Sequence, residues 1–211
     1  MIKRLYDITF AVLLFLVSTP IMLFAAFGIL ISNKGPVIYK AKRVGKNGIP
    51  FTLYKFRTMK VDSGEIKITT LKNDNRVFPF GSLLRKSKID ELPQLINIIL
   101  NQMSVVGPRP EDLVIVENIY KGDYKNIFKV KPGLTSPASL FDYTHGEKYQ
   151  NHEDYIKYFL PVKLEIELYY VNYQSFWYDV KITFKTALVI IQLLFGKTCF
   201  KYPKEYSIVH K

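Results

Sequence analysis

Two adjacent carboxylates, Asp90 and Glu91, stand at the start of an apolar helical pattern within residues 88–111. Acidic side chains are favoured in the first turn of a helix, where backbone N–H groups are unpaired and the helix dipole is positive, so the pair can serve the helix alone. The same field attracts phosphate oxygens and keeps a carboxylate ionised. The second interpretation is therefore that the pair handles a phosphate and a metal ion, with a carboxylate as the nucleophile.

Three basic side chains are candidates for binding such a phosphate. Lys55 and Arg57 project from one face of an extended run, which suits phosphate ligands but also a solvated basic edge or a contact with lipid headgroups. Arg109 lies in the Gly-Pro-Arg-Pro sequence of residues 107–110, a stiff turn with little backbone freedom. An arginine fixed in this way suits a phosphoryl group, and a structural salt bridge is the usual alternative.

The composition favours an anionic partner. The 211 residues carry a net charge of +12, and 48% of them are apolar, enough to fill a sizeable core. Nucleic acid, membrane lipid and a phosphorylated substrate all fit this charge. The single cysteine, Cys199, excludes an internal disulfide, and its distance in sequence from the three histidines excludes a zinc-ligand spacing.

An uncharged, almost wholly apolar segment spans residues 8–33 and predicts a membrane-embedded helix, because about 20 apolar residues suffice to cross a bilayer. Pro20 predicts a kink, and the hydroxyls of Thr19 and Ser18 can bond the carbonyls that the proline frees. Basic residues flank both ends, so the positive-inside rule draws both to the cytoplasmic side. A re-entrant helix-break-helix satisfies this rule, but a kinked spanning helix is the more common structure, and the sequence physics leaves the two evenly matched.

The rest of the chain predicts an α+β domain that is mostly helical with a small β-hairpin. Two extended runs flank an Asn-Gly turn at residues 45–48, and a polar loop at 61–80 precedes a short helix at 80–85. The next helix begins near Asp90, with Pro93 in its first turn. Residues 129–147 are predicted as a long loop. The helix that ends near Phe195 is too short in its apolar part to span, and we expect it at the membrane interface, with a core helix as the alternative.

Several blocks resemble the bacterial sugar transferases called monotopic polyprenyl-phosphate phosphoglycosyl transferases. They are LYKFRTM, LLRKSKIDELPQLINIILNQMSVVGPRP, VKPGLT and LYYVNYQSFWYDVKITFKTAL, and the resemblance runs from the N-terminal apolar segment to about residue 195. It implies a re-entrant membrane helix kinked at Thr19-Pro20, a catalytic nucleophile at Asp90, and Mg²⁺ held by Glu91 and Asp90. It also places basic residues near the substrate phosphates and an acidic residue at Glu167. The candidate substrate-binding residues are thus Lys55, Arg57, Arg85, Arg109 and Glu167.

The resemblance implies transfer of a sugar 1-phosphate from a nucleotide diphospho-sugar, with a UDP-sugar expected, to polyprenyl (undecaprenyl) phosphate. The reaction would pass through a covalent aspartyl-phosphosugar and release a nucleoside monophosphate, as the first membrane step of making a glycoconjugate such as exopolysaccharide or lipopolysaccharide. The expected site is the cytoplasmic face of the bacterial inner membrane, in contact with membrane lipid and without nucleic acid. The alternative is a basic membrane scaffold or nucleic-acid-binding protein without catalysis.

The resemblance also implies the short form of the family, with no further spanning helix before residue 1. The expected parts are a membrane helix at 1–33, a catalytic domain with interfacial helices at 34–196, and a tail at 197–211; homo-oligomerisation is left open. The chain departs from the family after the KPGLT block, where residues 136–142 read SPASLFD instead of Gly-Trp-Ala-Gln-Val-Asn-Gly. If that loop contacts sugar or nucleotide, donor preference cannot be carried over.

Overall fold

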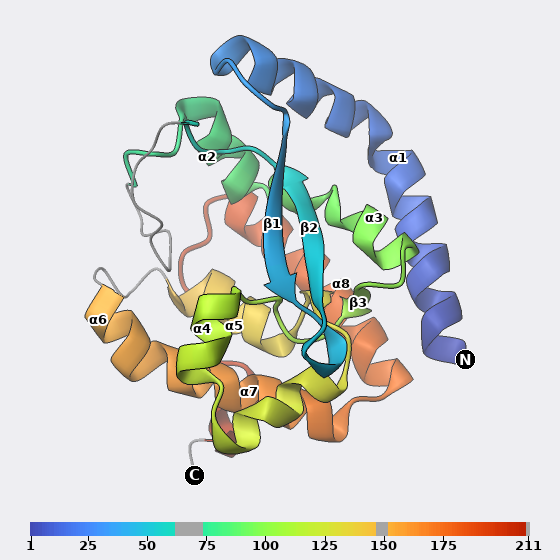
Figure 1. The fold of residues 1–211 in the computed structure, drawn as a ribbon, viewed down its shortest axis with the longest axis vertical. Coiled ribbons are helices and arrows are strands. Elements are labelled where there is room, and N and C mark those ends of the chain that lie inside the picture. Colours follow the sequence, from blue (N-terminus) through green and yellow to red (C-terminus); the bar gives the residue numbers. More distant parts are fainter. Residues whose placement is uncertain (62–73, 147–151, 210–211) are drawn as a thin grey trace.

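The computed structural model describes residues 1–61, 74–146 and 152–209 (Figure 1). The fold is α+β and mostly helical, with a small two-stranded antiparallel sheet. A long N-terminal helix runs along one side, the β-hairpin crosses the front, and the C-terminal helices lie below and behind (Figure 1). The predicted fold class is therefore confirmed.

The N-terminal helix α1 (Ile2–Ser32) is continuous through Pro20, and its ribbon bends along its length (Figure 1). The hydroxyls of Ser18 and Thr19 both donate to the carbonyl of Phe15, at 3.4 and 2.8 Å. This differs from the prediction, because the carbonyl that Pro20 leaves without its helical partner is that of Leu16. A helical hydroxyl reaches three or four residues back, and Phe15 is the carbonyl that both side chains can reach in this way.

Both halves of α1 pack on the same domain. Ala11 belongs to the main apolar core, and Ala25 and Ile29 belong to a second cluster with residues of β2 and α2. Near the N-terminus, Asp7 is buried and accepts hydrogen bonds from Ser104 Oγ and Val105 N, each at 2.9 Å. Because the helix returns to one domain at both ends, it is compatible with a monotopic membrane helix.

The outer face of α1 is strongly apolar. By length and composition, α1 is the one helix in the described ranges that could cross a membrane. Its large exposed apolar side chains include Leu13, Leu16, Val17, Leu23, Phe24 and Phe27. Water-soluble proteins seldom expose a contiguous apolar surface of this kind, so the face is suited to lipid.

The predicted hairpin is present as β1 (Ile38–Val44) and β2 (Pro50–Phe56), paired antiparallel with Ile38 opposite Phe56. The turn η1 (Lys46–Gly48) has positive φ at Asn47 and Gly48, as the Asn-Gly dipeptide predicted. The amide of Asn97 then accepts from Tyr54 N at 3.1 Å and donates to Thr52 O at 2.7 Å. These bonds fix β2 against the helix that follows the acidic pair.

The acidic pair lies in a short 3₁₀ turn, η2 (Ile89–Glu91), between α2 (Pro79–Lys86) and α3 (Gln94–Ile99). A single helix beginning near Asp90 was predicted, so this is a correction. Pro93 has no N–H to donate, and the surrounding amides of Leu92, Leu95 and Ile96 form three-residue turns instead. Asp90 and Glu91 therefore sit immediately before α3 on a tight turn.

Two segments that are distant in the sequence meet in the parallel pair β3 (Ser104–Val106) and β4 (Gly133–Thr135). The amide of Gly107 donates to Thr135 O at 2.9 Å, and that of Gly133 donates to Pro108 O at 2.8 Å. A Cβ on Gly133 would lie 2.1 Å from Gly107 N, so only glycine permits this approach. The turn that carries Arg109 is thereby held by backbone from a distant segment.

Residues 129–147 are not the long loop that was predicted. After α4 (Leu113–Ile119) and η3 (Gly122–Lys129), the strand β4 leads directly into the helix α5 (Pro137–His145). Ser136 caps α5, with its Oγ accepting from Ser139 N at 2.8 Å, and Pro137 occupies the first turn. A serine followed by proline is a recognised helix start, so the sequence held a signal for this helix.

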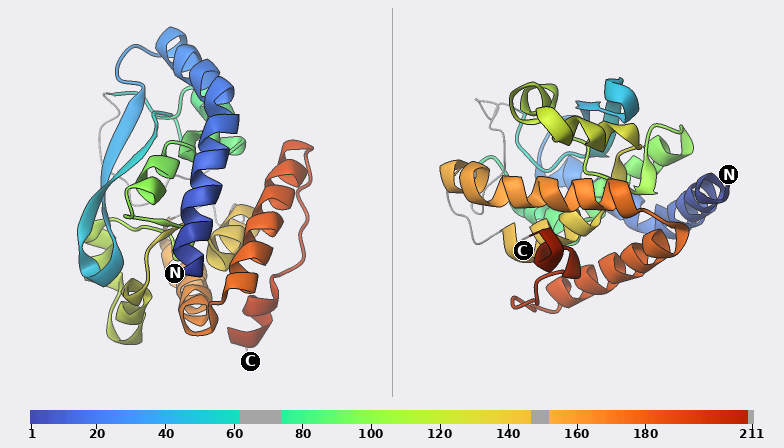
Figure 2. Two further views of the ribbon diagram at one scale, coloured as in Figure 1. Left: turned by 90° about the vertical axis from the view of Figure 1, so that its right-hand side faces the viewer. Right: turned by 90° about the horizontal axis from the view of Figure 1, so that it is seen from below.

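The C-terminal third contains α6 (His152–Asp154), η5 (Tyr155–Phe159), α7 (Leu160–Tyr173), α8 (Phe176–Leu194) and α9 (Lys204–Val209). The helix α8 lies beside α1 (Figure 2), where Tyr6 OH donates to Thr183 Oγ1 at 2.8 Å. Its exposed apolar stripe contains Trp177, Phe184, Leu188, Ile191 and Leu194, in agreement with an interfacial helix. The tail folds back, and Tyr178 OH donates to Glu205 Oε1 at 2.7 Å.

Candidate active site

The acidic pair is buried and each carboxylate has its own cation. Asp90 is 3% exposed and Glu91 is 6% exposed. Lys55 Nζ lies 3.4 Å from Asp90 Oδ2, and Arg109 Nη2 lies 3.2 Å from Glu91 Oε1. The hairpin supplies Lys55 and the turn after β3 supplies Arg109, so three separate segments meet at η2.

The surroundings shift the pKa values of the two carboxylates in opposite directions, raising that of Asp90 and lowering that of Glu91. Burial raises the pKa of Asp90; Lys55 opposes the rise, and the negative charge of Glu91 adds to it. Burial also raises the pKa of Glu91, but the charges of Arg109, Lys88 and Lys55 outweigh burial and lower that pKa to about 2. Glu91 is thus a fixed anion, and Asp90 is the more basic and more nucleophilic carboxylate.

Arg109 is positioned by Glu167 as well as by its proline-flanked turn. Glu167 is 1% exposed, and its Oε1 accepts from Arg109 N at 3.0 Å. Its contact is with the backbone of Arg109, so the side chain of Arg109 remains directed to Glu91. Glu167, on α7, therefore holds the backbone of the turn that carries Arg109.

Glu167 gives the fold a predictable pH dependence. Burial raises the pKa of Glu167 from 4.5, the value of an ordinary glutamate, to about 7. The charge of Lys163 and the hydrogen bond from Arg109 N oppose this rise. Because the folded protein holds this proton at pH values where the unfolded chain has released it, the free energy of unfolding falls by up to about 3 kcal/mol as pH rises through this window. Glu167→Gln keeps the acceptor for Arg109 N and removes the titrating group. We therefore expect the melting temperature of this variant, minus that of wild type, to increase by several degrees between pH 5 and pH 8.

The measurement is thermal unfolding of the purified protein at both pH values. Glu167→Ala is the control, because it removes the acceptor for Arg109 N and is expected to lower the melting temperature at each pH. An unchanged gap between Glu167→Gln and wild type across this range would contradict the assignment.

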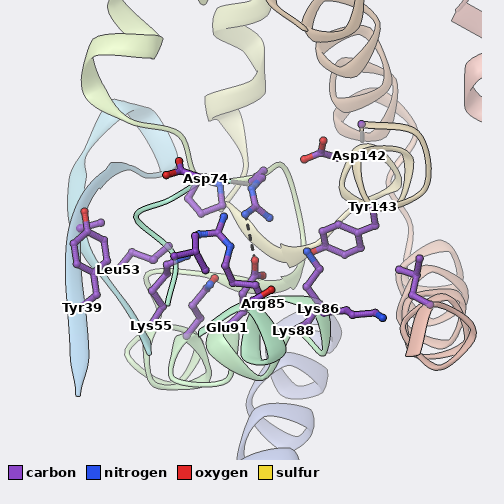
Figure 3. Close-up of a pocket in the computed structure, with 18 of the residues that line it drawn as sticks. Tyr39, Leu53, Lys55, Asp74, Arg85, Lys86, Lys88, Glu91, Asp142 and Tyr143 are labelled. Atoms are coloured by element: carbon purple, nitrogen blue, oxygen red, sulfur yellow. Dashed lines mark hydrogen bonds and ion pairs between the residues drawn. The ribbon is translucent and has the colours of Figure 1, made fainter. Parts of the chain in front are cut away.

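A cavity of about 1050 Å³ opens beside the acidic pair and is lined mainly by charged and polar side chains (Figure 3). Lys55, Arg85 and Arg109 line it, as does Glu91. Burial lowers the pKa of Arg85, and the charge of Asp90 opposes this. The cavity therefore collects positive charge next to a buried carboxylate pair, which suits an anionic substrate.

Sequence reasoning missed several residues of this cavity. They are Tyr39, Arg43, Lys88, Asp142, Tyr143 and Lys163. Lys88 directly precedes the 3₁₀ turn, but its type alone gave no signal. Asp142 and Tyr143 belong to α5, a segment that was predicted as loop. Predicting α5 from its Ser-Pro start would have made these residues candidates.

The structure does not bring Arg57 into the site. Its Nε donates to Pro36 O at 2.6 Å, and its guanidinium also bonds both the side chain and the backbone oxygen of Asn33. Arg57 lies just beyond β2, so the strand alternation that aligned it with Lys55 has ended. It ties the end of α1 to the hairpin instead. Thr19 and Pro20 also lie outside the cavity, within α1.

The residues present fit a magnesium ion. Asp90 Oδ1 is buried and has no hydrogen-bond partner within the described residues. Mg²⁺ is commonly held by one or two carboxylates together with substrate phosphates and water, so it does not need a cluster of three acidic residues. No such larger cluster is present in residues 1–61, 74–146 and 152–209. The orphan oxygen of Asp90 and the ionised Glu91 form a suitable donor pair.

Curated relatives carry names that describe sugar phosphate transfer. The chain is 35% identical to the UDP-glucose:undecaprenyl-phosphate glucose-1-phosphate transferase of Escherichia coli K12, over 89% of this chain and 39% of the relative. It is 36% identical to the UDP-N-acetylgalactosamine-undecaprenyl-phosphate N-acetylgalactosaminephosphotransferase of Aeromonas hydrophila, over 90% and 44%. It is 34% identical to the exopolysaccharide production protein PSS of Rhizobium leguminosarum bv. phaseoli, over 93% and 97%.

The chain thus spans about two fifths of the length of the first of these transferases and nearly all of the third protein. The family model described as bacterial sugar transferase matches residues 1–193, which include α1, the acidic pair and the turn that carries Arg109. With this match and these identities, the chain belongs to the bacterial sugar transferase family.

Proposed function

We propose that this protein is a phosphoglycosyl transferase that moves a sugar 1-phosphate from a nucleotide diphospho-sugar, a UDP-sugar by its relatives, to undecaprenyl phosphate. The observation that carries the proposal is Asp90, a buried carboxylate with one oxygen 3.4 Å from Lys55 Nζ and the other without a hydrogen-bond partner in the described chain. The names of the relatives support the substrate classes.

In the first step, an oxygen of Asp90 attacks the phosphorus that bears the sugar. A bond forms between that oxygen and phosphorus, and the bond from phosphorus to the bridging oxygen of the diphosphate breaks. The nucleoside monophosphate leaves with the bonding electrons, and the sugar phosphate stays on Asp90. Splitting the transfer in this way replaces one difficult displacement by two easier ones.

In the second step, an oxygen of the lipid phosphate attacks the same phosphorus. The bond to Asp90 breaks, the polyprenyl diphospho-sugar departs, and the carboxylate is regenerated. Lys55 and Arg109 neutralise the charge that the phosphoryl oxygens bring to the acidic pair, and Glu91 keeps Arg109 in place. When bound by Glu91 and Asp90, Mg²⁺ would supply further neutralisation of the diphosphate.

The membrane location follows from the acceptor. Its phosphate lies at the lipid boundary while its polyprenyl tail stays in the hydrocarbon, so the enzyme must work at that depth. The helices α1 and α8 lie side by side (Figure 2). Both expose large apolar side chains, which supports attachment to a single leaflet. We place the protein at the cytoplasmic face, where the basic residues around both ends of α1 favour it.

The test is incubation of the purified protein with a panel of UDP-sugars, Mg²⁺ and undecaprenyl phosphate, with nucleotide products identified by chromatography. At least one donor is expected to release UMP, and chelation of the metal is expected to stop the release. Without the lipid phosphate, release should stop at about one UMP per protein. Release of UDP instead would mean transfer of sugar without its phosphate and would overturn the proposal.

A further inference from the structure

Lys88 and Tyr143 contact each other in the wall of the cavity. Lys88 Nζ lies 3.7 Å from the centroid of the Tyr143 ring, and both residues line the cavity beside Glu91 (Figure 3). Lys88 belongs to the segment that leads into η2, and Tyr143 belongs to α5. The pair is therefore a contact between two distant segments at the acidic pair, made by a cation on the face of an aromatic ring.

The backbone of Lys88 is in a conformation that lysine seldom adopts. Its φ and ψ are 58° and 13°, in the left-handed region just after α2, where glycine is the usual residue. A side chain costs free energy there, and strained residues of this kind cluster at functional sites. The observation points to a use for the Lys88 side chain that offsets the strain.

The aromatic contact leaves the charge of Lys88 available. The neighbouring cations Lys55 and Arg109 each form an ion pair with a carboxylate of the acidic pair. In the described part of the chain, Lys88 forms no such pair. A ring face orients an ammonium without neutralising it, so Lys88 keeps its capacity to bind an anion that enters the cavity.

The ring of Tyr143 sits on a braced element. On α5, Phe141 stacks on Phe159 with centroids 4.7 Å apart, and His145 stacks on Tyr202 of the tail at 4.3 Å. Packing on the outer side of α5 thus holds the helix whose Tyr143 contacts the cavity. A side chain on such an element can fix its neighbour accurately.

We propose that Lys88 binds a phosphate oxygen of the donor diphosphate and that Tyr143 positions the Lys88 ammonium for this contact. The inference deepens the proposed function and rests on it for the identity of the donor. Lys88 would be a substrate-binding residue, and Tyr143 would act through it.

The test is calorimetric binding of UDP to the purified 211-residue protein, with melting temperatures measured in parallel. Lys88→Met keeps the length of the side chain without its charge and is expected to weaken UDP binding about 10- to 100-fold, the range for a lost charge-assisted contact. Lys88→Arg should stay within a few-fold of wild type. Tyr143→Phe keeps the ring and should bind normally, whereas Tyr143→Leu should bind about 5- to 10-fold more weakly.

A double variant separates positioning from a merely structural role. If Tyr143 acts through Lys88, adding Tyr143→Leu to Lys88→Met should weaken binding no further. Lys88→Gly should relieve the left-handed backbone and melt no lower than wild type while still binding weakly. Unchanged UDP binding by Lys88→Met, absence of UDP binding by wild type, or additive losses in the double variant would each overturn the inference.

The UDP-binding test of Lys88 and the transfer test of the proposed function can fail independently. A protein that binds UDP through Lys88 but transfers no sugar phosphate would refute the proposed reaction and leave the binding role standing. If the wild-type protein transfers sugar phosphate and Lys88→Met binds UDP with wild-type affinity, only the role of Lys88 is refuted.

Discussion

Asp90→Asn is expected to abolish UMP release, with a loss of about 10⁴-fold or more, the size seen when a covalent nucleophile is removed. The amide keeps the shape of the side chain but has no anionic oxygen to attack phosphorus. The fold should survive, because burial raises the pKa of Asp90 and a neutral group costs less in that position than a carboxylate. The melting temperature of the variant should therefore equal or exceed that of wild type.

The same variant tests the covalent intermediate. Wild-type protein incubated with donor but without lipid phosphate should gain the mass of one sugar phosphate, on the peptide that contains Asp90. The Asn variant should gain nothing. Ser87→Ala is a suitable control, because its hydroxyl bonds the carbonyls of Leu83 and Leu84 at 2.9 and 3.1 Å rather than the acidic pair. Turnover by Asp90→Asn at the wild-type rate would show that Asp90 is not the nucleophile.

Local patterns predicted the hairpin and the apolar helix well. The Asn-Gly turn required positive φ, and Asn47 and Gly48 have it. The uncharged stretch of residues 8–33 predicted a membrane-embedded helix with a kink at Pro20, and α1 covers it as one continuous apolar helix. What the pattern could not decide was whether the helix returns to one domain, since that depends on contacts of Ala11, Ala25 and Ile29 with residues far along the chain.

Only part of the site was predicted, because local patterns reveal some of its residues and not the contacts between distant segments. Asp90, Glu91 and Arg109 were recognisable because a turn and an apolar pattern surround them, and the structure brings them together. Arg57 was grouped with Lys55 by strand alternation, but β2 ends at Phe56 and the rule no longer applies beyond it. Lys88 was missed because a lysine in a left-handed conformation has no sequence signature.

Arg109→Met is expected to lower the transfer rate by about 10²- to 10³-fold, the range for losing one charged donor to the developing phosphoryl charge. It should also destabilise the protein by about 2 kcal/mol at pH 7, because Glu91 is left buried and ionised without its partner. The rate is measured by UMP release and the stability by thermal unfolding. Arg109→Lys should recover only part of the rate, since an ammonium lacks the planar fork of the guanidinium.

A double variant can separate the effect of Arg109 on the transfer rate from its effect on stability. The pKa of Glu91 is lowered to about 2 in the folded protein, so the pair contributes stability above pH 4.5 that is lost as the pH falls toward 2. The deficit of Arg109→Met should accordingly shrink over that interval. Adding Glu91→Gln removes the unpaired charge and should restore the melting temperature at pH 7 while transfer stays lost. Recovery of transfer along with stability would show that Arg109 serves the fold alone, and that the phosphoryl charge is neutralised by other groups.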